Sequence, residues 1–131
     1  MNNAPSALER QIALQKRTAQ FALASIRFCR SMQNSVEGRH IIGQLVRCST
    51  SVASNYRAAC RARSRREFVA KLGIVVEEGD ESLFWLDLVG DLGLNVGEAL
   101  VSLRKEANEL VSIFTAARST AARSLKDAPK S

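Results

Sequence analysis

The sequence predicts an all-α protein whose 131 residues form a single antiparallel, up-down-up-down four-helix bundle. Three observations predict this fold. Apolar residues recur at three- and four-residue steps through four long segments, and no segment shows the two-residue alternation of a β-strand. The connections between these segments are short and contain turn-forming residues. Aromatic residues make up only 5% of the chain and there are two prolines, which suits helices packed through aliphatic side chains.

The first helix is expected over residues 6–32. Ser6 followed by Glu9 matches a capping box, in which each side chain can accept a hydrogen bond from the other residue's backbone N–H. Apolar residues then recur with helical spacing and are expected to face the core. They are Leu8, Ile12, Ala19, Ala22, Leu23, Ile26 and Cys29.

The second helix is expected over residues 38–62, and its side chains divide into three faces at about 100° per residue. The core face contains Ile41, Ile42, Leu45, Cys48, Val52, Tyr56, Ala59 and Cys60. A basic face covering an arc of roughly 80° contains Arg39, Arg47, Arg57 and Arg61. Between them runs a strip of small or polar residues that would let another helix approach closely: His40, Gln44, Ser51, Asn55 and Ala58.

The third helix is expected over residues 65–90, after a second capping box formed by Ser64 and Glu67. Its core stripe contains Phe68, Leu72, Val75, Val76, Leu83 and Leu86, with Gly79 and Ser82 as small members. A second stripe is apolar at both ends and acidic between them: Ile74, Glu78, Glu81, Trp85 and Leu88. An apolar second face with a Trp predicts a subunit interface, and the alternative is a Trp that its own chain covers.

The fourth helix is expected over residues 96–122, because Asn95 with Glu98 gives a third cap signal. Its single apolar stripe contains Val96, Leu100, Leu103, Ala107, Leu110, Phe114, Ala117 and Ala121. Residues 124–131 are polar and are expected to form a flexible tail.

The net charge of +6 is unevenly distributed along the chain. Residues 1–66 contain 12 Lys and Arg against 2 acidic residues, whereas residues 67–131 contain 7 against 11. This split indicates either an anionic partner for the first half or ion pairing between the halves, within or between subunits.

Cys29, Cys48 and Cys60 each fall in an apolar helical pattern and are expected to be reduced and mostly buried. No signal peptide or membrane-spanning run is recognisable, so a cytoplasmic protein without a membrane partner is expected.

Catalysis is not expected, because His40 is the only histidine and no catalytic relay can be built around it. No zinc, di-iron or phosphate-loop motif occurs, so no metal or cofactor is expected. Glu77, Glu78, Asp80 and Glu81 are interpreted as ion-pair partners for the arginines, although a metal-dependent carboxylate site is the alternative.

The arginines carry the strongest functional signal. Five of them fall within ten residues at the boundary of the second and third helices, and Arg suits phosphate because its planar fork binds bidentately. Tyr56, the nearest aromatic residue, is expected in the core, so backbone contact rather than base readout is predicted. The predicted nucleic-acid surface contains Arg39, Arg47, Arg57, Arg61, Arg63, Arg65 and Arg66.

Two sets of residues resemble a known bacterial family. The first is the segment Ser51-Val52-Ala53-Ser54-Asn55-Tyr56-Arg57-Ala58-Ala59. The second is Arg61-Ala62-Arg63-Ser64, Phe68, Lys71, Leu72, Glu77, Glu81, Ser82 and Trp85-Leu86. The family is that of the four-helix bundle proteins encoded by intervening sequences of 23S ribosomal RNA genes, also called S23 ribosomal proteins. The resemblance extends over about residues 39–88.

The resemblance implies a bundle that assembles into a ring, commonly a homopentamer. A related branch contains the accessory protein of diversity-generating retroelements, which binds a reverse transcriptase and nucleic acid. Carried over to this chain, the resemblance adds Lys71 to the basic surface and places Glu77, Glu81 and Trp85 near subunit contacts. The full expected interface is therefore Ile74, Glu77, Glu78, Glu81, Trp85 and Leu88.

Two functions remain open from the sequence. The first is a non-enzymatic oligomer that binds RNA or DNA backbone, and one form of it is an accessory to a reverse transcriptase or another RNA-handling protein. The alternative is a structural or adaptor oligomer whose basic face pairs with the acidic surface of a neighbouring subunit or protein partner.

Overall fold

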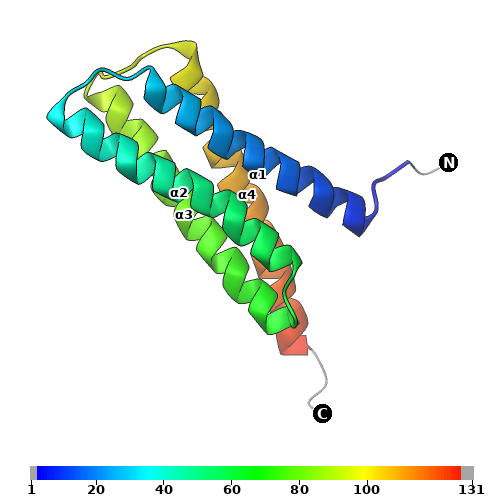
Figure 1. The fold of residues 1–131 in the computed structure, drawn as a ribbon. Coiled ribbons are helices and arrows are strands. Elements are labelled where there is room, and N and C mark those ends of the chain that lie inside the picture. The colour runs from blue at the N-terminus through cyan, green and yellow to red at the C-terminus, as the bar shows by residue number, and fades with distance from the viewer. Residues whose placement is uncertain (1–2, 128–131) are drawn as a thin grey trace.

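The four expected helices are present in a computed structural model of the chain, which describes residues 3–127 (Figure 1). They are α1 (Ala7–Arg30), α2 (Val36–Cys60), α3 (Arg65–Asp91) and α4 (Glu98–Asp127). Each helix packs against the next one along the chain, and no strand occurs among the described residues. The predicted all-α bundle is therefore confirmed. None of the described helices has an apolar stretch long enough to cross a membrane.

Side-chain caps define where three of the helices begin. Ser6 Oγ accepts a hydrogen bond from the Glu9 N–H at 3.1 Å, and Ser64 Oγ accepts one from the Glu67 N–H at 3.1 Å. Ser35 does the same for the Gly38 N–H at 3.0 Å, so α2 begins two residues earlier than expected. Each cap satisfies a backbone donor that has no partner within its helix.

The fourth helix differs from its expected bounds at both ends. Asn95 Oδ1 accepts from the Gly97 N–H at 2.9 Å, which forms a turn before the helix rather than its first cap, and Val96 is exposed. At the other end the helix continues to Asp127, so residues 124–127 are helical and not part of a tail. Residues 124–127 contain neither Gly nor Pro, so none of them breaks the helix. The rest of the expected tail lies outside the described residues.

The core is formed by the predicted stripes of α2, α3 and α4. Leu45, Leu72 and Leu86 are completely buried, and the Tyr56 ring packs on Phe114 with 4.8 Å between ring centroids. Gly79 allows close packing of α4, because a Cβ there would lie 3.0 Å from a methyl group of Val111.

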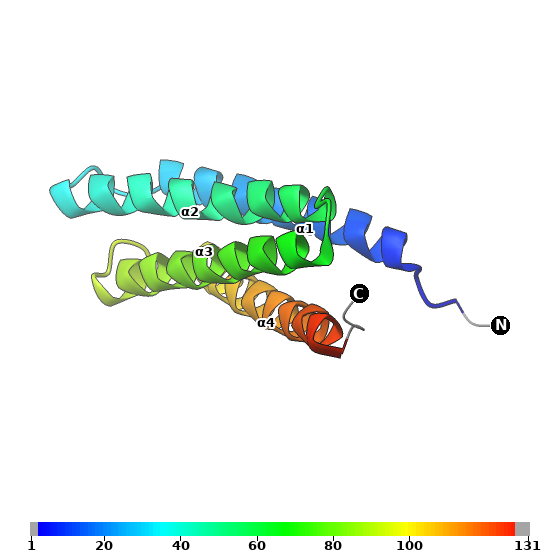
Figure 2. The ribbon, with the colours of Figure 1, turned by 90° about the horizontal axis from the view of Figure 1, so that it is seen from below.

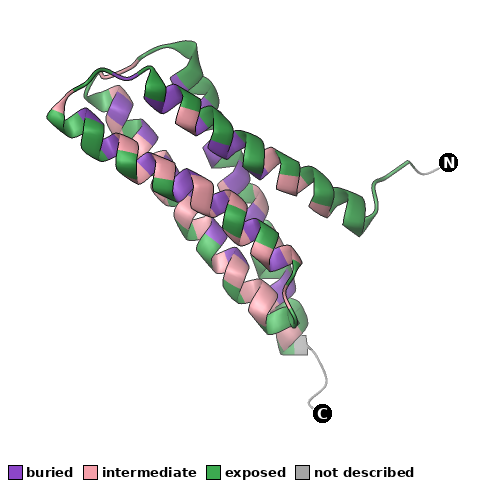
Figure 3. Ribbon diagram, in the orientation of Figure 1, coloured by how far each residue is buried: buried purple, intermediate pink, exposed green. Residues whose placement is uncertain are grey.

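The predicted core stripe of α1 is wrong in part. Leu8, Ile12 and Leu23 are exposed, with 65%, 46% and 47% of their surface accessible, and Ala19 is exposed too. Ala22 and Cys29 are buried as predicted, whereas the buried Phe21 and Phe28 were not in the predicted stripe. The buried residues of α1 lie in its C-terminal half (Figure 3). Thr18 and Ser25 are also fully buried, on the same side as the two phenylalanines.

Two properties of the side chains explain this orientation. A buried aromatic ring removes more apolar area from water than Leu or Ile does. Thr18 satisfies its hydroxyl within the helix, donating to the Leu14 carbonyl at 2.9 Å, so it can face the core although the sequence pattern counts it as polar.

The first helix is attached mainly along one edge. It packs against α2 over much of its length, but it contacts α4 less and diverges from it toward the N-terminus (Figures 1 and 2). At the point of divergence, the Arg17 guanidinium bridges to Glu106 and Glu109 of α4, each at 2.6 Å.

The orientation of α1 can be tested with two substitutions two residues apart. Phe21→Ala is expected to lower the free energy of unfolding by about 3–5 kcal/mol, because it empties a buried position. Leu23→Ala is expected to cost less than about 1 kcal/mol, because Leu23 is half exposed in the single chain. Urea unfolding at protein concentrations where the chain is monomeric would measure both, and a larger loss for Leu23→Ala would contradict this orientation.

Candidate nucleic-acid interface

The candidate site lies at the end of the bundle where α2 turns into α3. Ser64 caps α3 immediately after the connection, so the last turn of α2 and the first turn of α3 lie next to each other (Figure 1). The chain therefore concentrates five exposed arginines at this end. They are Arg57, Arg61, Arg63, Arg65 and Arg66.

The fourth helix adds cations that sequence reasoning did not include in the site. Because α3 and α4 are antiparallel neighbours, the last turns of α4 lie beside the first turns of α3. Arg118 lies over Gly73, where a Cβ would be 3.2 Å from its Nε atom, and Arg123 is exposed further along α4. The predicted up-down topology could have placed Arg118 and Arg123 at this end of the bundle. We call Arg57, Arg61, Arg63, Arg65, Arg66, Arg118 and Arg123 the basic end.

Few anions compete for these side chains. Within the described residues, the only ion pair at the basic end joins Arg63 Nε and Glu67 at 3.5 Å, and the Arg63 side chain is 90% exposed. Such an exposed pair contributes little energy and leaves the guanidinium accessible. Lys71, which the family resemblance added to the surface, is half-buried.

The structure does not bring Arg39 and Arg47 into this group. Arg39 lies in the first turn of α2, at the opposite end of the bundle. At 1.5 Å per residue it is about 33 Å from Arg61 along the helix axis. Its guanidinium donates a hydrogen bond to Asn34 Oδ1 at 2.7 Å. Arg47 faces α3, where its two terminal nitrogens lie 3.2 Å from Glu78 and 2.6 Å from Glu81. The predicted basic face of α2 is therefore divided into three separate parts.

The four clustered carboxylates of α3 also separate into two groups. Glu78 and Glu81 turn toward α2 and bind Arg47, whereas Glu77 and Asp80 are exposed on the outer side of the helix. Hydrogen bonding by Arg47 lowers the pKa of Glu81, whereas burial raises the pKa of Glu78. No group of three or more metal-binding side chains is found in the described part of the chain.

The expected interface residues are unequally exposed. Trp85 is half-buried and packs edge-on against His40 of α2, with 5.6 Å between ring centroids, so its own chain covers part of it. Ile74 is exposed and Leu88 is half-buried. The large apolar side chain that points outward is Phe84, which is 56% exposed and was absent from the expected interface. Phe84 precedes Trp85 by one position in the sequence, and only the placement of α2 shows which of the two is covered.

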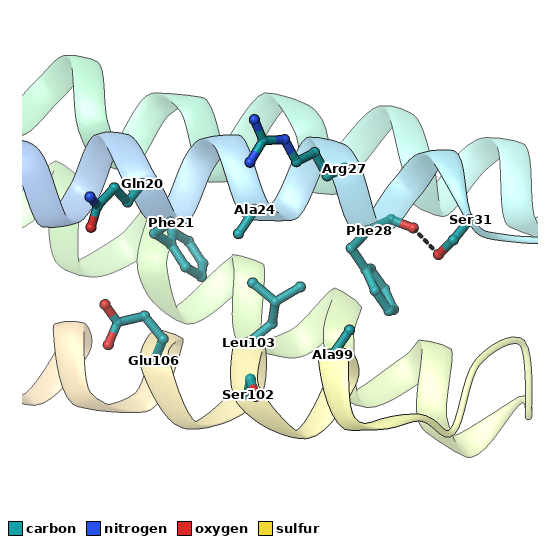
Figure 4. A pocket seen from close by; sticks show the side chains of 10 residues that line it. All are labelled: Gln20, Phe21, Ala24, Arg27, Phe28, Ser31, Ala99, Ser102, Leu103 and Glu106. Atoms are coloured by element: carbon teal, nitrogen blue, oxygen red, sulfur yellow. Dashed lines mark hydrogen bonds between the residues drawn. The ribbon is translucent and has the colours of Figure 1, made fainter.

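Two grooves run along α1. The groove between α1 and α4 has a volume of about 570 Å³, and Phe21, Phe28 and Leu103 form its apolar floor (Figure 4). The groove between α1 and α2 has a volume of about 660 Å³, and its lining includes Arg57 and Arg61 of the basic end.

The three thiols are free, and Cys29 and Cys48 are buried. Burial raises the pKa of Cys29 to about 11 and also raises the pKa of Cys48, so both thiols are protonated at neutral pH.

Comparison with known proteins establishes the family. The model of the 23S rRNA-intervening sequence proteins matches residues 10–116. The chain belongs to this family. A crystal structure of a protein of unknown function from the S23 ribosomal protein family of Bacteroides thetaiotaomicron has the same fold, with a TM-score of 0.76 and 23% sequence identity. The alignment covers 83% of this chain and 97% of that one. No curated protein matches the sequence.

The role of Arg47 can be tested through the titration of its partners. Arg47→Gln is expected to raise the pKa of both Glu81 and Glu78, because Arg47 lowers each of them in the native protein. The lowered pKa of Glu81 stabilises the native fold above the ordinary Glu pKa, and this contribution is lost as pH falls through the folded-state value. Removing Arg47 removes this contribution of Glu81, and burial continues to raise the pKa of Glu78, so the stability of the variant should fall less than that of the native protein as pH falls from neutral.

Carbon NMR of the Glu carboxyl groups, with urea unfolding across the same pH range, would measure these effects. Arg104→Gln is the matched control, because Arg104 pairs with Asp87 on another part of α3. An unchanged Glu81 titration in Arg47→Gln would show that the ion pair does not form in solution.

Proposed function

We propose that this protein is a non-enzymatic helical bundle that binds nucleic-acid backbone through its basic end. The observation that carries the proposal is the concentration of exposed arginines at one end of the molecule, with Glu67 as the only acidic ion-pair partner there among the described residues. Guanidinium groups bind phosphate bidentately and remain charged at all physiological pH values. Several of them together would displace condensed counterions, which makes binding strong at low salt and weak at high salt.

The geometry favours contacts to phosphate rather than to bases. Tyr56 is buried against Phe114, and Phe68 is packed partly against the core. Tyr56 therefore offers no surface to an unstacked base, and a single half-buried ring at Phe68 does not form a platform for successive bases. The N-terminal end of α3 adds a partial positive charge close to Arg65 and Arg66.

A second function, as a structural or adaptor oligomer, is favoured by a different observation. Ile74 and Phe84 expose apolar surface on the outer side of α3, among acidic side chains. A single bundle gains nothing from this arrangement, whereas a protein contact would bury it. Ile74 and Phe84 are not part of the basic end, so both functions can belong to one protein.

Fluorescence anisotropy with a labelled RNA hairpin and a labelled single strand, measured over a range of salt concentrations, tests the first function. Replacing Arg63, Arg65 and Arg66 together with Ala is expected to weaken binding to all sequences alike. It should also reduce the slope of log K against log salt by about two to three.

The control variant replaces Arg27, Arg30 and Arg39 with Ala, because these exposed arginines lie at the opposite end of the bundle. It has the same net charge as the test variant and should retain most of the affinity. Equal losses for the two variants would indicate attraction by net charge alone, and no binding by the native protein at low salt would exclude the function.

A further inference from the structure

The unexpected orientation of α1 leaves an apolar surface uncovered. The groove between α1 and α2 contains Leu23, Ile26 and Ala19 from α1, and small residues from α2. Leu23 is 47% exposed, and the same side of α1 continues through Ile12, which is 46% exposed. The groove is therefore an apolar strip long enough to receive a helix, with small side chains on the α2 side that allow close approach.

Cations line this groove. Lys16 of α1 and Arg57 and Arg61 of α2 belong to its lining, and all three are exposed. In the described part of the chain, none of the three takes part in an ion pair, whereas Arg17 and Arg47 each bind two carboxylates. The groove thus combines uncovered apolar area with unpaired positive charge, and a complementary partner must be apolar and acidic.

The outer face of α3 has this composition. At about 100° per residue, Ile74, Glu77, Phe84 and Leu88 fall within an arc of about 80° on the side of α3 away from the core. Phe84 is 56% exposed. Glu77 and the neighbouring Asp80 are exposed and have no ion-pair partner in the described residues. Glu81 falls within the same arc, but Arg47 of the same chain binds its carboxylate, and Glu78, which Arg47 also binds, lies outside the arc.

We propose that the outer face of α3 in one copy docks into the α1–α2 groove of a second copy. Phe84 and Ile74 would cover the apolar strip around Leu23, and Glu77 would approach Lys16 and Arg57. A nucleic acid satisfies only the charges of this groove and leaves Leu23 and Ile12 uncovered, so a protein helix is the better occupant. The inference rests on the oligomer function and names both of its contact surfaces.

The two surfaces belong to different sides of the bundle. The third helix packs against α2 and α4, whereas the groove lies between α1 and α2, so one chain cannot place its own α3 face in its own groove. Each docking event leaves one groove and one α3 face free. The proposed contact is heterologous rather than a reciprocal two-fold pair, so that copies would add head to tail until the assembly closes or continues to grow.

A mixing experiment tests this arrangement through one substitution on each surface. Leu23→Asp places a carboxylate in the groove, and Phe84→Asp removes the apolar anchor of the α3 face. Native chains are expected to assemble, and each variant alone should give the 14.3 kDa mass of a single chain by light scattering. An equimolar mixture should give a dimer and nothing larger, because only one native groove and one native face remain in each pair.

Val101→Asp is the matched control, because Val101 is exposed on α4 outside both surfaces and the variant should assemble like the native chain. Circular dichroism would establish that each variant is folded. If either Asp variant unfolds, Arg57→Glu and Glu77→Arg replace it, since both residues are exposed. The double variant Arg57→Glu/Glu77→Arg should then recover assembly that each single change abolishes.

The outcomes separate the inference from the function on which it rests. Monomeric native protein at all concentrations would overturn both. Native oligomers that persist in Leu23→Asp or Phe84→Asp would overturn the docking arrangement alone. A mixture that remains monomeric, or that recovers the native mass, would show that the two surfaces do not bind each other head to tail.

Discussion

The rotation of α1 about its own axis is the constraint on which the other surfaces depend. With Phe21 and Phe28 turned into the core, Arg17 lies opposite Glu106 and Glu109 of α4 and joins the two helices where they diverge. The same rotation turns Leu23 outward and creates the groove with α2. A rotation that buried the Leu8–Ile12–Leu23 side would close this groove and move Arg17 away from both carboxylates. The ion pairs of Arg17 and the exposed apolar strip around Leu23 therefore both result from this orientation of α1.

The division of charge follows a similar logic. Arginines that face a neighbouring helix are paired within the chain, as Arg47 is with Glu78 and Glu81. Those at the basic end face solvent, because α2 and α3 turn there and little acidic surface lies within reach. An exposed ion pair adds little stability, but it determines which charges remain available to other molecules. On this view the Arg47 cluster aligns α2 with α3 and leaves the outer carboxylates Glu77 and Asp80 unpaired.

Much of the fold could be predicted from the sequence, because periodicity and capping are local properties. The Ser6 and Ser64 caps and the buried sides of α2, α3 and α4 follow from spacing alone. The orientation of α1 does not, because Thr18 and Ser25 count as polar in a pattern but are buried in the structure. Arg118 was absent from the predicted basic surface, because it reaches this end only through the antiparallel packing of α4 on α3, which the predicted topology implies but local spacing does not show. Which of Phe84 and Trp85 is exposed depends on His40, which lies on another helix.

The two proposed activities would reinforce each other through geometry. A heterologous contact relates neighbouring copies by one repeated operation, and in a closed assembly that operation is a rotation about a single axis. Equivalent basic ends would then lie at one level around this axis, with Arg57 of each copy in the contact and Arg63, Arg65 and Arg66 outside the groove lining. A nucleic acid that binds one basic end would meet the next at a high effective concentration, so weak phosphate contacts could together give strong binding. The fold itself specifies neither activity. The nucleic-acid binding is suggested by the exposed arginines at the basic end. The assembly is suggested by the unpaired, complementary charges of the α1–α2 groove and the outer face of α3.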